Sequence, residues 1–143
     1  MDKSTTKKLE EVLLNLDHQK ELDNYINDEN NMIAYNLVAD YLNDFFKNKD
    51  ISSLFKKSEI DRTYAYQILN GTKPNPGRDK IIKLCIAGEL SVKETTRALE
   101  IAKAGILYPR EKRDAIILFA INNKLSVQDT NMLLDSYDLD ILN

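Results

Sequence analysis

Apolar residues recur at every third or fourth position along most of the chain, which is the spacing of one face of an α-helix. Strict alternation of apolar and polar residues, which is typical of a half-buried strand, is absent. The pattern therefore predicts an all-α protein of about seven or eight helices.

The first fifty residues contain three segments of different helical strength. A helix is expected from about Thr5 to Leu16, and residues 17–31 are expected to form only a short amphipathic turn. Residues 32–47 have the strongest amphipathic pattern and predict a long helix. Seven residues form its apolar face: Ile33, Leu37, Val38, Tyr41, Leu42, Phe45 and Phe46.

Two short helices are predicted next, separated by a turn at residues 58–60. Asp50 is placed to cap a helix that runs through Lys57, and Asp61 is placed to cap a second helix. The second helix is expected to stop at Asn70-Gly71, because glycine readily adopts the left-handed conformation that ends helices. Two short helices joined by such a turn form the helix-turn-helix pattern.

The apolar residues of this segment sit where a helix-turn-helix needs them. Leu54 and Phe55 of the first helix are expected to pack on Ile60 in the turn and on Ala65 and Ile68 of the second helix. The small side chain of Ala65 lets the two helices approach closely.

A proline-rich turn, residues 73–77, separates this segment from the next helix. Asn75 and Pro76 suit the N-cap and the first turn of that following helix.

An internal repeat occupies the rest of the chain. Residues 78–107 and 113–142 are related by an offset of 35 positions and share 12 identities in 30. Each copy predicts a helix, a turn and a second helix, with Ser91 or Ser126 capping the second helix. Because about three repeats are needed for a free-standing array, we expect the two copies to pack on the preceding helices and to serve as scaffold.

Composition removes several classes of function. The 143-residue chain has one cysteine, Cys85, and one histidine, His18, too few for an internal disulfide or a four-ligand zinc site. Its four glycines form no phosphate-binding cluster, and no set of side chains suggests a catalytic site. We therefore expect a protein that is not an enzyme and that binds no metal or other cofactor. Cys85 lies on an apolar helix face and is expected to be a buried hydrophobic side chain.

Charge is distributed unevenly along the chain. The formal net charge is −3, yet residues 51–83 carry seven basic and three acidic side chains. The segments on either side are acidic, so the helix-turn-helix segment forms a basic centre that favours anionic partners.

The second helix of the motif carries polar residues suited to reading DNA. Arg62, Thr63, Tyr66 and Gln67 are expected to point outward, where arginine can pair with guanine and glutamine with adenine. Flanking residues that can contact phosphates are Lys56, Lys57, Asn70 and Lys73.

These residues resemble the Xre/Cro-type, lambda-repressor-like family of helix-turn-helix repressors. The resemblance is carried by DRTYAYQILNGTKP at 61–74 and RDKIIKL at 78–84, and it extends over about residues 33–104. It implies a lambda-repressor-like core with residues 61–70 as recognition helix. It also implies base contacts by Arg62, Thr63, Tyr66 and Gln67, and a phosphate contact by Asn70.

We therefore expect three regions: an N-terminal helical extension at 1–31, a helix-turn-helix DNA-binding domain at 32–107, and a C-terminal helical hairpin at 108–143. The expected function is sequence-specific regulation of transcription in a bacterial or phage setting, by a homodimer on double-stranded DNA. The polar N-terminus and the lack of long apolar runs predict a cytoplasmic protein without a membrane segment. The alternative is an adaptor that reuses the fold to bind a partner protein, for instance through its N- or C-terminal helices, without binding DNA.

Overall fold

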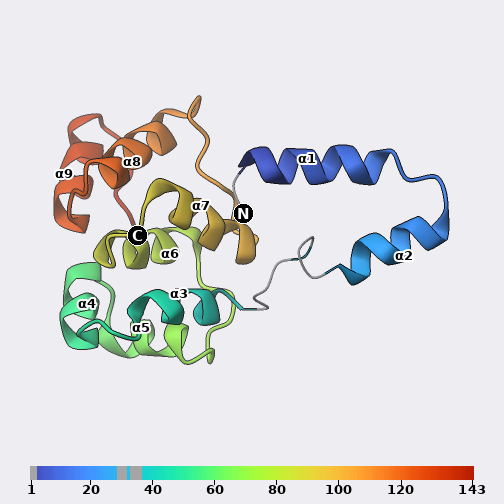
Figure 1. The fold of residues 1–143 in the computed structure, drawn as a ribbon. Coiled ribbons are helices and arrows are strands. Elements are labelled where there is room, and N and C mark those ends of the chain that lie inside the picture. Colours follow the sequence, from blue (N-terminus) through green and yellow to red (C-terminus); the bar gives the residue numbers. More distant parts are fainter. Residues whose placement is uncertain (1–2, 29–31, 33–36) are drawn as a thin grey trace. The chain divides into compact units, whose positions relative to one another are not determined.

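A computed structural model describes residues 3–28, 32 and 37–143 of the protein (Figure 1). These residues form nine helices and no strand, which confirms the all-α prediction and exceeds the expected helix number. The chain divides into two compact units, residues 1–36 and residues 37–143. In the described ranges, no helix combines the length and the apolar character needed to cross a membrane.

The first unit contains two amphipathic helices, α1 (Lys3–Leu14) and α2 (Gln19–Asn27). Helix α1 lies about two residues nearer the N-terminus than expected. The expectation of only a short turn at 17–31 was wrong, because α2 forms a nine-residue helix there. Its residues Leu22, Tyr25 and Ile26 have the spacing of one helix face, and none of the α2 side chains is buried.

The second unit begins with three helices that pack around one core. They are α3 (Val38–Phe46), α4 (Ile51–Ser58) and α5 (Arg62–Leu69). Two long-range hydrogen bonds hold α3 in place. The Asn43 side chain donates to the main-chain oxygen of Leu69 at 2.7 Å, and the Tyr41 hydroxyl donates to that of Glu94 at 3.1 Å.

Helix α3 begins later than the sequence pattern indicates. Leu37 has extended backbone angles and precedes the first turn, so the described helix starts at Val38 rather than at residue 32. The intervening prediction for residues 33–36 lies outside the described residues.

Four further helices complete the unit: α6 (Arg78–Ala87), α7 (Val92–Ile101), α8 (Lys112–Asn122) and α9 (Val127–Ser136). Helix α6 contacts α4, α7 and α9, and its residues 81–87 are all buried. The first repeat copy rests on the preceding helices, as expected, because α4 packs against α6 and α3 against α7. The second copy differs from the expectation, since its main contacts are with the first copy, α8 with α7 and α9 with α6. Cys85 is fully buried in this core, as predicted.

The start of α6 corrects one prediction. Gly77, not Asn75, is the residue that precedes the first helical turn, and it provides no side-chain cap. Gly77 has extended rather than helical backbone angles, with ψ of 156°. The helix therefore begins two residues later than predicted.

The two repeat copies have matching local structure. Each forms a helix pair whose second helix is capped by a serine, with Ser91 accepting from the Glu94 N–H and Ser126 from the Asp129 N–H, both at 3.0 Å. The backbone is left-handed at four matching positions, Glu89 and Lys124 in the turns and Lys103 and Asp138 after the second helices.

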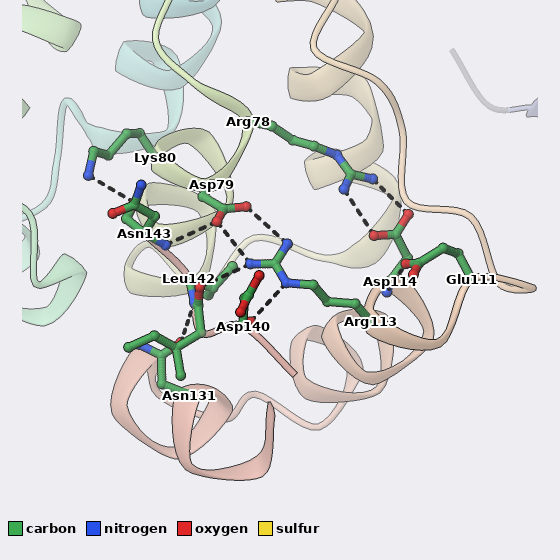
Figure 2. Close-up of polar contacts among 11 residues, drawn as sticks. Arg78, Asp79, Lys80, Glu111, Arg113, Asp114, Asn131, Asp140, Leu142 and Asn143 are labelled. Atoms are coloured by element: carbon green, nitrogen blue, oxygen red, sulfur yellow. Dashed lines mark hydrogen bonds and ion pairs between the residues drawn. The ribbon is translucent and has the colours of Figure 1, made fainter. Parts of the chain in front are cut away.

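Reciprocal contacts join the copies (Figure 2). Arg78 of the first copy binds the Asp114 carboxylate, and its equivalent Arg113 binds Asp79. The carboxylates also accept equivalent main-chain N–H groups, Asp114 that of Tyr108 at 2.9 Å and Asp79 that of Asn143 at 3.0 Å. An operation that carries the first copy onto the second therefore also carries the second onto the first, which makes it an approximate two-fold rotation. The repeats form a closed pair rather than the start of an open array.

Candidate nucleic-acid interface

Short-range hydrogen bonds set the geometry of the α4–α5 turn. The Asp50 carboxylate caps α4 by accepting from the N–H groups of Ser52 and Ser53, as predicted. At the other end, the buried Ser58 hydroxyl donates to the Phe55 main-chain oxygen at 2.7 Å and accepts from the Ile60 N–H at 3.2 Å. Glu59 is left-handed, with φ of 56°, so the chain reverses sharply between the two helices.

The inner side of α5 is anchored in the core. Ala65 and Ile68 have no exposed surface, and Leu54, Phe55 and Ile60 are also buried, which confirms that these predicted core residues are buried. Asp61 caps α5 by accepting from the Tyr64 N–H at 3.2 Å. These contacts fix the direction in which the outer side chains point.

The outer side of α5 carries the predicted base-reading residues. Arg62 and Thr63 are exposed, Tyr66 is 61% exposed, and Gln67 is half-buried. Arg62 and Tyr66 are four positions apart, as are Thr63 and Gln67, so each pair lies on one side of the helix. Both pairs lie away from the side that carries Ala65 and Ile68. The helix therefore presents a polar surface that begins at its N-terminal end.

Hydrogen bonds in the turn after α5 position Asn70 and Lys73, the two residues there that are predicted to contact phosphates. Asn70 is exposed, and its side-chain oxygen accepts from the Thr72 N–H at 2.8 Å, so its amide N–H groups are not used in this bond. The Lys73 main-chain N–H donates to the Gln67 oxygen at 3.0 Å, so this lysine is fixed one turn from the reading residues. Gly71, with φ of 82°, supplies the left-handed residue predicted for the helix end.

Lys56 and Lys57 are exposed on the last turn of α4. Lys57 shares a hollow of about 220 Å³ with Ser53, Ala87 and Glu89. It therefore lies beside the turn between α6 and α7, and no contact of the described residues brings it next to the outer side of α5.

Two lysines flank the ring of Tyr64. The Lys73 ammonium lies 5.3 Å from the ring centroid and the Lys80 ammonium 5.6 Å from it. Both distances are within the range of a cation–π interaction. Lys80 was not among the predicted site residues, although its position in the basic stretch 51–83 was the available signal. The tertiary fold thus extends the cationic surface from α5 onto the first turn of α6.

Lys83 lies in α6, one helical turn beyond Lys80, and is a second lysine of this helix. Its side chain is buried, and burial together with repulsion from Lys80 lowers the pKa of its ammonium group. The carboxylates of Glu59 and Asp79 act in the opposite direction and favour the charged form. Glu59, the acidic residue of the helix-turn-helix turn, therefore lies in the field of a buried lysine.

A hollow of about 700 Å³ lies between α6 and residues 140–143. Lys80, Lys83 and Arg113 line it together with Asp79 and Asp140. The Arg113 donors are already used by Asp79 and by the main-chain oxygens of Asp140 and Ile141. No group of histidine, cysteine or carboxylate residues in the described ranges has the arrangement of a metal site.

Comparison with known proteins adds no family assignment: no family model, no curated protein and no solved structure matches the chain.

Proposed function

We propose that the protein is a sequence-specific DNA-binding regulator of transcription of the Xre/Cro type, with α5 as its recognition helix. One observation supports this above the others. Helix α5 buries Ala65 and Ile68 completely while it exposes Arg62, Thr63 and Tyr66 on its outer side. A short helix anchored on one side and polar on the other is the element that enters the major groove in helix-turn-helix proteins.

In this proposal Arg62 and Gln67 discriminate between bases. Arginine pairs with the O6 and N7 acceptors of guanine, and glutamine pairs with N6 and N7 of adenine. Thr63 contacts a thymine methyl or a phosphate, and Tyr66 lies against the groove wall. Both residues are exposed in the first two turns of the helix, the part that reaches base edges.

The flanking lysines set the affinity rather than the sequence preference. Lys73 and Lys80 both lie close to the Tyr64 ring, where they can neutralise phosphates next to the groove. A single module of this size covers few base pairs. We therefore include in the proposal a homodimer that binds a two-fold symmetric site, in the cytoplasm of a bacterial cell and without a cofactor.

The test is selection of duplexes from a random library by the full chain at low salt, followed by affinity measurements on the enriched sequence. Arg62→Ala and Gln67→Ala are expected to reduce preference for that sequence about 5- to 150-fold, since one bidentate contact contributes about 1–3 kcal/mol of discrimination. Lys73→Ala is expected to weaken binding to every duplex about equally and to reduce the salt slope by about 1.

Arg110→Ala is the matched control, because Arg110 is an exposed arginine outside the helix-turn-helix segment. Its loss is expected to leave the sequence preference unchanged. If the wild-type chain enriches no duplex and binds none at low salt, the proposal is wrong, and the same outer side of α5 becomes the candidate surface of a protein-binding adaptor.

A further inference from the structure

A buried lysine lines the hollow between α6 and residues 140–143, which we call the α6 hollow. Only 6% of the surface of Lys83 is exposed, and its side chain forms part of the wall of the hollow. Its ammonium group forms no hydrogen bond or ion pair with any residue in the described part of the chain. Lysine is rarely buried unless its charge is paired, which indicates a partner that the chain itself does not supply.

The internal repeat shows that the helix does not need a lysine at this position. The equivalents of Lys80 and Lys83 in α8 are Ala115 and Leu118, and Leu118 is half-buried. An apolar side chain therefore suits this position of the shared helix pattern. The first copy instead carries a charge at the more buried of the two positions, which is the opposite of what burial favours.

The lining of the α6 hollow keeps ammonium donors unused while its inner carboxylate is occupied. Lys80 donates to the Asn143 main-chain oxygen at 2.8 Å, which uses one of its three N–H donors (Figure 2). The Asp79 carboxylate accepts from the Arg113 guanidinium and from the Asn143 N–H. The charges of the hollow that remain available to a ligand are therefore mainly the ammonium groups of Lys80 and Lys83.

We propose that the α6 hollow binds the phosphate group of a small phosphorylated molecule, with Lys80 and Lys83 as its ligands. The two lysines are three positions apart and share one side of α6, so both ammonium groups can reach one anionic group. A phosphate monoester carries about two negative charges near neutral pH, which matches two lysines.

The donor set favours phosphate over a carboxylate. A planar carboxylate is best bound by the flat fork of an arginine, whereas lysine binds phosphate as a point charge. The fork of Arg113, the arginine of the α6 hollow, is already occupied by Asp79. The volume of about 700 Å³ lies in the range of small-molecule sites and leaves room for the organic part of the ligand.

This inference goes beyond DNA binding and is tested in the absence of DNA. Inorganic phosphate and phenyl phosphate are titrated into the isotope-labelled full chain at constant ionic strength, and the amide signals are followed by NMR. Succinate, a dianion with carboxylate groups, is the control ligand. Phenyl phosphate is expected to shift the signals of residues 79–83 and 140–143 in a saturable way, with a Kd of about 1 mM or lower. Succinate is expected to bind much more weakly.

Lys83→Met removes the charge and keeps an unbranched side chain. It is expected to weaken phenyl phosphate binding at least about tenfold, because a charge-assisted hydrogen bond is lost. Its melting temperature should be equal to or above that of the wild type, since the second copy carries Leu118 at the equivalent position. Lys47→Met is the matched control, because Lys47 is an exposed lysine at the end of α3 and outside the lining of the hollow. It removes the same charge and should leave binding unchanged.

Asp140→Asn tests the charge of the hollow in the opposite direction. Asp140 is exposed and is the second carboxylate of the lining, so its negative charge opposes a bound phosphate. The variant is expected to bind phenyl phosphate a few-fold more tightly, with a smaller difference from the wild type at high salt.

The backbone of DNA is another source of phosphate groups, and Lys83→Met also distinguishes it. We expect this variant to bind duplex DNA as the wild type does, whether that binding is strong or absent. No saturation by phenyl phosphate below about 10 mM, equal binding of succinate, or an unchanged Kd in Lys83→Met would each overturn the proposal. Loss of duplex binding in Lys83→Met, without binding of phenyl phosphate by the wild type, would assign the α6 hollow to the DNA backbone instead.

Discussion

The guanidinium of Arg78 binds the carboxylate of Asp114 through two hydrogen bonds, of 2.9 and 2.8 Å, across the approximate two-fold axis of the repeat. The same arginine donates to the main-chain oxygens of Gly105 and Ile106, at 3.0 and 2.8 Å. Asp114 therefore joins the start of one copy to the start of the other (Figure 2). Arg78 also fixes the segment that connects the copies.

Asp114→Asn is expected to lower the free energy of unfolding by roughly 3 kcal/mol. The substitution keeps the shape of the side chain but leaves the Arg78 charge without its partner, and removing one member of a largely buried ion pair costs about 3–5 kcal/mol. We place the loss at the low end because the Arg78 side chain is 27% exposed. Urea unfolding followed by circular dichroism measures it.

Asp79→Asn provides the matched comparison. Its equivalent pair with Arg113 is also doubly hydrogen-bonded, at 3.3 and 2.9 Å, but both side chains are about one-fifth exposed, whereas Asp114 is only 7% exposed. The loss for Asp79→Asn should therefore be the smaller of the two. Equal losses, or a larger loss at Asp79, would contradict the assigned role of burial.

Stability should fall as the solution is acidified below about pH 4. Burial raises the pKa of Asp114, but the hydrogen bonds from Arg78 and from the Tyr108 N–H outweigh it, so the pKa lies below its usual value. Asp79 behaves alike, with Arg113 and the Asn143 N–H as donors. Carboxyls with a lowered pKa in the folded state contribute stability that is complete above the unfolded pKa of about 4 and is lost as the pH falls through the folded value.

Unfolding by urea at a series of pH values between about 2 and 7 checks this dependence. The double variant Asp79→Asn, Asp114→Asn should be less stable at pH 7 and should show a flatter decline below pH 4. A variant that declines as steeply as the wild type would show that other carboxyls govern the acid sensitivity.

The features that could be read from the sequence depend on residues close together in the chain. The caps at Asp50, Asp61 and Ser91 join groups two or three positions apart, so spacing was enough to predict them. The apolar spacing likewise predicted the burial of Ala65 and Ile68.

The features that were missed depend on how helices meet in space. The 35-residue offset indicated that Arg78 and Arg113 are equivalent, but each binds the aspartate of the other copy, which only the packing of the copies decides. Lys80 and Tyr64 are sixteen positions apart and become neighbours because α6 begins beside α5. The base-reading roles of Arg62 and Gln67 stay predictions, since they concern a partner molecule.

Gly88→Ala is expected to destabilise the protein by about 1–3 kcal/mol through overpacking. A Cβ atom at this position would lie 2.4 Å from the ring of Phe46, a fully buried side chain, so the ring would have to shift within the packed core. The equivalent position of the second copy holds Asn123, which is exposed, so Asn123→Ala should change the melting temperature little. A Gly88→Ala protein as stable as the wild type would show that the Phe46 ring can shift.

Lys80→Gln is expected to weaken DNA binding several-fold and to reduce the salt slope by about 1, because one phosphate contact is lost. The substitution also removes the hydrogen bond from Lys80 to the Asn143 main-chain oxygen, so the melting temperature must be measured in parallel. Arg110→Gln removes one positive charge from an exposed position outside the interface and should leave the slope unchanged. The comparison separates a contact made by Lys80 beside Tyr64 from a general effect of net charge. Equal changes in the two variants would exclude Lys80 from the interface and confine the DNA-binding surface to α5 and Lys73.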